Sequence, residues 1–144
     1  MSLVNKKAKF DYEIIESYEA GIILTGSEVK SIRGGSVNFA GSRVVFVDGK
    51  VKLLGLNINK YKYDSSENYE PSKVRGLLLK KSEIIEIQTK SKASGLTLVP
   101  VKLYNKGSLI KLQIALVRGK KKFEKRAEIK KRDTDRGLAR RLKK

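Results

Sequence analysis

Residues 42–56 read SRVVFVDGKVKLLGL, two apolar runs joined by Asp48-Gly49. Valine, phenylalanine and leucine in short runs are typical of strands, and Asp-Gly accepts the positive φ angles of a type I′ turn. The stretch therefore predicts a β-hairpin and indicates an antiparallel β protein.

A second hairpin is predicted near the end of the folded part, where residues 96–104 (LTLVPVKLY) and 108–117 (SLIKLQIALV) flank a turn at residues 105–107. The second run alternates with period two, so one face is expected to be buried. Its buried face would hold Ile110, Leu112, Ile114 and Leu116, and its outer face Lys111, Gln113 and Ala115. Pro100 is expected at an edge or a bulge.

The segment before the first hairpin predicts a strand and then a short helix. Residues 10–24 mix aromatic and β-branched residues with polar ones, with a bend or bulge expected at Gly21. Residues 26–35 (GSEVKSIRGG) predict a two-turn helix capped by Ser27, with Glu28 near its positive end and two glycines that end it. Val29 and Ile32 would face the core.

Between the two hairpins, residues 60–72 are polar and predict a loop, and residues 74–89 are dense in leucine and isoleucine. That density favours one helix, or two short ones divided near Ser82, followed by a turn over residues 90–95. Residues 5–9 are interpreted as a short basic arm.

These elements predict a mainly β fold of five or six antiparallel strands with flanking short helices. A closed or partly closed barrel of the oligonucleotide-binding (OB) type fits best, because so few strands otherwise leave exposed edges. The predicted division is a barrel over residues 1–118 and a basic tail over residues 119–144.

Charge points to a polyanionic partner. The 144 residues include 33 Lys+Arg and 15 Asp+Glu, a formal net charge of +18, and residues 119–144 alone hold 13 basic against 4 acidic side chains. Such an excess favours nucleic acid. An anionic membrane is disfavoured, since no basic stretch carries a wide apolar face or a tryptophan.

Composition also argues against an enzyme. The chain has no histidine and no cysteine, the commonest general base and the commonest metal ligands. Glu13, Glu16 and Glu19 lie in the predicted strand, where residues three apart point to opposite faces, so they are not expected to pair as acid and base. We therefore expect no catalytic residue, metal or cofactor.

The N-terminus has no apolar run of seven residues, and no window of the chain reaches eighteen apolar residues. The sequence therefore predicts neither a secretory signal nor a membrane span, and indicates a soluble, cytoplasmic protein.

Basic side chains outside the tail are predicted to be exposed and to include an RNA-binding face. They are Lys6, Lys7, Lys9, Lys30, Arg33, Arg75, Lys80 and Lys81.

The tail predicts a conditional helix. Phe123 offers a stacking ring inside a basic run, and Glu124, Glu128 and Lys131 or Arg132 stand at helical spacings. An isolated helix of this length is marginal in water, so we expect the tail to be disordered when free and to complete its helix on phosphate contacts.

Several stretches together resemble the SmpB (small protein B) family, the tmRNA-binding proteins of bacterial trans-translation. They are NKKAKFDYEI, YEAGIILTGSEVKSIRGG with VNF after it, RGLLLKKSEI, LTLVPVKLY and GKKKFEKRAEIKKRD. The resemblance runs from about Asn5 to the end of the chain.

The resemblance implies a monomeric RNA-binding adaptor without enzyme activity. In that family the OB-type barrel holds the tRNA-like part of tmRNA, and the complex, charged with alanine and carried by elongation factor Tu, enters stalled ribosomes for their rescue. The tail then folds at the decoding centre, against 16S rRNA, and senses the empty mRNA channel.

Carried onto this chain, the resemblance implies tmRNA contacts at Asn5, Glu19 and the leucines around Leu78, with Lys30 and Arg33 as basic neighbours. The exposed cations Lys6, Lys7, Lys80 and Lys81 complete the predicted tmRNA-binding set. In the tail, the resemblance implies ribosome contacts at Phe123, Glu124, Lys125 and Arg126. The basic residues Lys120, Lys121, Lys130, Lys131 and Arg132 complete the predicted ribosome-binding set. Glu19 would be a specificity element that accepts from base amino groups or orients a neighbouring basic side chain.

Three positions depart from the family's usual pattern. Glu124 stands in place of Asp, Ser27 in place of Thr or a bulkier residue, and Lys80 where His is common. Two other functions remain open on the sequence: a ribosomal or assembly protein that binds ribosomal RNA permanently, and an enzyme subunit.

Overall fold

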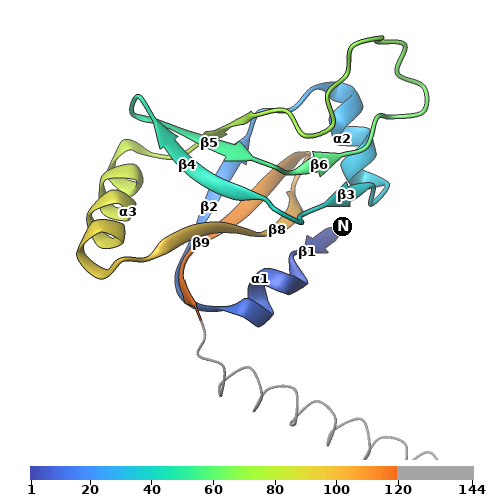
Figure 1. The fold of residues 1–144 in the computed structure, drawn as a ribbon. Helices are drawn as coiled ribbons and strands as arrows, with labels where there is room; N and C mark the ends of the chain where they lie inside the picture. Colours follow the sequence, from blue (N-terminus) through green and yellow to red (C-terminus); the bar gives the residue numbers. More distant parts are fainter. Residues whose placement is uncertain (120–144) are drawn as a thin grey trace, which may run out of the picture.

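The computed structural model describes residues 1–119, and its main element is a curved, antiparallel seven-stranded sheet (Figure 1). The strand order is β1-β8-β9-β2-β7-β5-β4. These strands are β1 Ser2–Val4, β2 Tyr12–Ile22, β4 Arg43–Val47, β5 Lys50–Leu54, β7 Arg75–Leu78, β8 Thr97–Lys106 and β9 Leu109–Gly119.

Two further strands pair with each other, β3 (Val37–Asn38) and β6 (Asn57–Ile58), and the helices are α1 (Lys6–Asp11), α2 (Gly26–Arg33) and α3 (Lys81–Ser94). The predicted number of strands, five or six, was therefore too low, because residues 1–119 form nine. Strand β4 contacts β8, but within residues 1–119 the two share no hydrogen-bonded ladder, so the barrel is OB-like and only partly closed. The predicted mainly β fold is confirmed.

Both predicted hairpins are present. In the β4–β5 turn the φ angles of Asp48 and Gly49 are 50° and 73°, as a type I′ turn requires. In the β8–β9 hairpin the register shifts between Pro100 and Lys102, which confirms the bulge expected at the proline. The β8–β9 turn begins at Gly107, two residues later than predicted, because β8 continues to Lys106, two residues past its apolar run.

The short basic arm predicted over residues 5–9 is instead part of a helix, because residues 6–11 form α1. This helix is capped by Asn5, whose Oδ1 accepts from the Ala8 N–H at 3.2 Å. Ala8 packs on the sheet face that lies opposite the main core, together with Val99, Val101, Ala115 and Val117. Strand β9 is therefore buried on both faces where α1 covers it, although its alternation predicted one buried face.

Strand β2 carries a bulge at Ile15, where its register against β9 shifts, and not at Gly21 as predicted. The extra residue puts Glu13 and Glu16 on one side of the strand, so the argument from spacing was wrong for that pair. Each still has its own cation: Glu13 pairs with Arg118, and Glu16 with Lys90.

Helix α2 forms where the sequence predicts it, but its cap is Thr25 and not Ser27. The Thr25 Oγ1 accepts from the Glu28 N–H at 3.2 Å, and the Thr25 N–H donates to Glu28 Oε1 at 3.0 Å. Capping from a residue two positions earlier lets Glu28 occupy the third helical position of this reciprocal motif. Ile32 is fully buried and Val29 packs beside it, as expected.

Residues 59–74 form the predicted loop, but the helix predicted after it is wrong at both ends. Leu77 and Leu78 belong to strand β7, and the helix runs from Lys81 through the predicted turn to Ser94. Gly95, with φ of 60°, ends it in the left-handed conformation. A run of leucines shows apolar density without period, so strand and helix were not separable there.

Arg75 is buried, and its interpretation as exposed is the largest error. Only 2% of its surface is exposed, and all five of its guanidinium N–H positions have acceptors in reach. Nε donates to Glu28 Oε2 at 2.6 Å, and the other donors reach the Leu56, Lys73 and Pro71 carbonyls and the Tyr69 hydroxyl. The pair joins α2, the β5–β6 connection, the loop of residues 59–74 and β7.

Replacing Arg75 by methionine should destabilise the fold strongly, because it leaves the Glu28 carboxylate buried without its main partner. We expect a loss of about 3–5 kcal/mol in the free energy of unfolding, measured by denaturant titration. Arg118→Met, which breaks the exposed pair with Glu13, is the matched control and should cost little. Equal losses in the two variants would contradict this account.

The same pair predicts a pH dependence. Burial raises the pKa of Glu28, but the Thr25 N–H and the Arg75 guanidinium outweigh burial and hold this pKa below its ordinary 4.5. The stability that the charged form adds is therefore present above about pH 4.5 and is lost as the pH falls through the lower folded pKa. Glu28→Gln should lose this dependence, so the gap in unfolding free energy between the two proteins should narrow in acid. A gap that stays constant down to pH 3 would argue against it.

Candidate nucleic-acid interface

The sheet face that points away from the core is divided in two. Helix α1 covers the half formed by the ends of β8 and β9 near Thr97 and Gly119, and it lies beside these strands in Figure 1. No helix within residues 1–119 covers the other half. We call it the open face, and by register and exposure it is formed by Glu19, Gly21, Leu78, Lys102, Tyr104, Lys106, Lys111 and Gln113.

Glu19 lies near the middle of the open face and points outward, opposite Gln113 in register. Its Oε2 accepts from the Tyr104 hydroxyl at 2.5 Å, and its Oε1 lies 2.9 Å from the Lys106 Nζ. Both bonds cross β9 and tie β2 to β8. They lower the pKa of Glu19, the Tyr104 bond first and the Lys106 bond second.

Three lysines surround that carboxylate, so the open face is basic overall. Lys111 is paired in register with both Gly21 and Tyr104, and Lys102 lies with its Nζ 5.2 Å from the centre of the Tyr104 ring. Lys106 is 65% exposed along its side chain. Cations beside an accessible ring suit RNA, which offers phosphates and base faces.

Leu78 extends the open face onto β7. It is paired with Gly21, and 61% of its surface is exposed although it is a large apolar residue. A side chain at Gly21 would meet the Leu78 Cβ at 3.2 Å, so the glycine makes room for this leucine. Ile23, also exposed, donates its N–H to the Gly76 carbonyl beside it. Leu78 and Ile23 together form an exposed apolar surface that a base or a ribose can contact.

Lys80 and Lys81 follow Leu78 directly, at the start of α3, and both are exposed. The Lys80 N–H donates to Glu83 Oε1 at 3.1 Å, which fixes the first turn of the helix. The two lysines therefore follow directly after the exposed Leu78 of the open face.

Asn5 has a structural task that the sequence did not reveal. Besides capping α1, it donates its Nδ2 to the Pro100 carbonyl at 2.9 Å, and so fastens α1 to the bulge of β8. Lys6 and Lys7, both exposed, follow on the helix.

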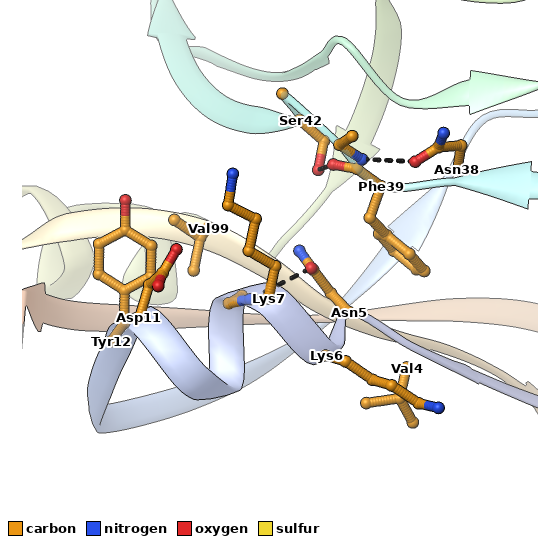
Figure 2. Close-up of a pocket in the computed structure, with 13 residues that line it drawn as sticks. Val4, Asn5, Lys6, Lys7, Asp11, Tyr12, Asn38, Phe39, Ser42 and Val99 are labelled. Atoms are coloured by element: carbon orange, nitrogen blue, oxygen red, sulfur yellow. Dashed lines mark hydrogen bonds between the residues drawn. The ribbon is translucent and has the colours of Figure 1, made fainter. Parts of the chain in front are cut away.

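A groove of about 500 Å³ separates α1 from residues 38–42. Figure 2 shows Lys7 extending from α1 toward this segment, whereas Lys6 points away from it. Phe39 and Asn38 line the opposite wall, and the Asn38 Oδ1 accepts from the Ala40 N–H at 2.9 Å, which shapes the turn. The groove thus combines a cation, a ring and an amide.

Lys30 and Arg33 lie on α2 and not on the sheet. Arg33 Nη2 donates to the Ser108 carbonyl at 3.1 Å, which places this guanidinium at the β8–β9 turn, beside the end of the open face that holds Lys106. The Lys30 Nζ lies 5.3 Å from the centre of the Tyr61 ring, in the loop of residues 59–74. The structure therefore places Arg33 at the turn that follows Lys106, and Lys30 beside the loop.

Sequence reasoning missed four residues of the open face: Tyr104, Lys102, Lys106 and Lys111. Residues 102, 104 and 106 alternate along one strand, and that period could have identified them once the face was known. The tail positions Lys120, Lys121, Phe123, Glu124, Lys125, Arg126, Lys130, Lys131 and Arg132 lie outside the described residues.

The described residues offer little to other kinds of site. In residues 1–119 no three acidic side chains gather closely enough to hold a metal ion. The helices of that same part are too short or too polar to cross a bilayer.

Comparisons with known proteins agree with this geometry. The family model described as SmpB protein matches residues 2–144. An SsrA-binding protein of Thermosipho melanesiensis is 48% identical over 96% of this chain and 95% of its own length, and one of Solidesulfovibrio magneticus is 45% identical over 96% and 90%.

A similar solved structure carries the name "tmRNA-SmpB: a journey to the center of the bacterial ribosome". It superposes with a TM-score of 0.69 at 47% identity, covering 84% of this chain and 85% of that one. A family match along nearly the whole sequence and relatives above 40% identity lead to one conclusion. The chain belongs to the SmpB protein family.

Proposed function

We propose that this chain is an RNA-binding adaptor that binds the tRNA-like domain of tmRNA and brings it to stalled ribosomes for trans-translation. The observation that carries the proposal is the open face, where three lysines, a tyrosine ring and an exposed leucine surround one carboxylate. Relatives named SsrA-binding protein and a related structure with tmRNA and the ribosome support the same partners.

The tmRNA contacts divide by chemistry. Lys6, Lys7, Lys80 and Lys81 are exposed cations at the margins of the sheet face and would set affinity through phosphates, independently of sequence. Leu78 offers an apolar surface to a base or ribose. Asn5 acts indirectly, by fixing α1 and its lysines to β8.

The α2 cations extend this surface. Arg33, held at the β8–β9 turn, continues the basic margin of the open face, and Lys30 continues it toward Tyr61. We assign both to tmRNA and not to a separate partner, because Arg33 donates to the Ser108 carbonyl, two residues after Lys106 of the open face.

The tail, residues 119–144, is the ribosome-binding element of the proposal. It carries half of the excess positive charge in under a fifth of the chain, so 16S rRNA at the decoding centre and in the mRNA channel is a suitable partner. The proposal has the tail disordered when free and helical in the empty channel. Elongation factor Tu enters indirectly, through alanyl-tmRNA, and the adaptor works by binding alone.

This division of labour predicts the effect of removing the tail. A chain ending at Gly119 keeps β9 whole, with its ladders to β2 and β8, so it should bind tmRNA with near-normal affinity. It should fail to support tagging on ribosomes stalled at the end of a message. Gel-shift titration with a tmRNA transcript and a reconstituted tagging reaction measure the two activities.

Loss of tmRNA binding in the chain ending at Gly119 would overturn the division, provided its circular dichroism still shows the β fold. A permanent ribosomal protein would behave differently, co-purifying stoichiometrically with all ribosomes and not with stalled ones.

A further inference from the structure

The Glu19 carboxylate is already engaged within the protein. One oxygen accepts from the Tyr104 hydroxyl at 2.5 Å, and the other lies 2.9 Å from the Lys106 ammonium. A base amino group would have to share or displace one of these two donors. The geometry therefore favours a role for Glu19 that acts through its two partners.

Tyr104 is well suited to be the group that contacts RNA. Its ring stands on the open face between Lys102, whose ammonium lies 5.2 Å from the ring centre, and its register partner Lys111. Burial, and then the bond to Glu19, raise the pKa of Tyr104 to about 12, so the hydroxyl keeps its proton and remains a donor. The ring is thus held at both ends, by its backbone and by its hydroxyl.

Lys106 complements that ring. It comes two residues after Tyr104 on the same side of β8, and its side chain is 65% exposed although its ammonium contacts Glu19. The carboxylate fixes one direction of the ammonium and leaves its other protons accessible. Groups held in place before binding lose less conformational entropy when the partner arrives.

We propose that Tyr104 and Lys106 form a contact site for one exposed nucleotide of the bound RNA, the base against the ring and the phosphate on the ammonium, and that Glu19 is a positioning residue that holds both. This inference rests on the proposed function, since it names groups that contact the same RNA. It assigns binding to two residues and removes Glu19 from direct contact with a base.

A double-mutant cycle in the full-length chain tests the positioning role, with a transcript of the tRNA-like domain of tmRNA as the probe. Tyr104→Phe keeps the ring but loses its anchor to Glu19, and should weaken binding about fivefold, an effect smaller than loss of a whole stacking contact. Glu19→Ala should weaken binding about tenfold, because it releases both partners. In the Glu19→Ala background, Tyr104→Phe should have no further effect, since no anchor remains to be lost.

Two variants test the contacts themselves. Tyr104→Leu removes the ring and should weaken binding more than Tyr104→Phe. Lys106→Met should lower the slope of log Kd against log salt by about 0.7–0.9, the value of one phosphate contact. A residue that only stabilised the fold would leave that slope unchanged.

Glu16→Ala is the matched control. Glu16 is on the same strand as Glu19 and also pairs with a lysine, Lys90 of α3, but it points to the other side of the sheet. RNA binding by this variant should equal that of the unmodified chain. All variants should unfold within a few degrees of each other, because the changed groups are on the surface.

The proposal is overturned if Tyr104→Phe binds like the unmodified chain while Glu19→Ala is weak, or if the effect of Tyr104→Phe is the same in both backgrounds. Either result would make Glu19 a direct RNA contact. Failure of the proposed function gives a different result: the unmodified chain would not distinguish the tRNA-like transcript from an unrelated hairpin of equal length.

Discussion

The buried ion pair between Arg75 and Glu28 is the interaction on which the arrangement of this domain depends. The ladders of the sheet do not hold the loop of residues 59–74 or helix α2, because neither contributes a strand to it. Arg75 collects a carboxylate, three carbonyls and a hydroxyl from those segments at one buried point. A guanidinium can do this because its five donors diverge in one plane. Helix α2 and its basic residues are thereby held against the sheet.

Much of this fold follows from local patterns in the sequence, and the errors have physical causes. Asp48-Gly49 and the alternation after Gly107 identified the hairpins because turn chemistry and period two are local properties. Arg75 could not be identified as buried, because its acceptors come from residues 28 to 73 and only the folded chain brings them together. The same holds for α1, which forms because Ala8 finds an apolar sheet face under it.

The candidate interface shows the same division. Exposed lysines at the margins were predictable from charge. The central cluster was not, because Tyr104 and Lys106 follow Glu19 in the sequence by 85 and 87 positions. The sequence offered two roles for Glu19, accepting from a base or orienting a basic side chain, without identifying its partners. In the folded chain the Glu19 carboxylate holds the Tyr104 ring and the Lys106 ammonium in place, and it also limits the repulsion between neighbouring lysines.

Strand β9 has a mechanical consequence. It is bonded to β2 on one side and β8 on the other along nearly its whole length, and it ends at Gly119, where the basic segment begins. A pull on that segment along the strand direction would load both ladders in shear, with many hydrogen bonds sharing the force at once. The domain therefore resists extension from its C-terminal side as a single rigid body, and displacement of the segment is transmitted to the face that carries Glu19 without first unravelling the barrel.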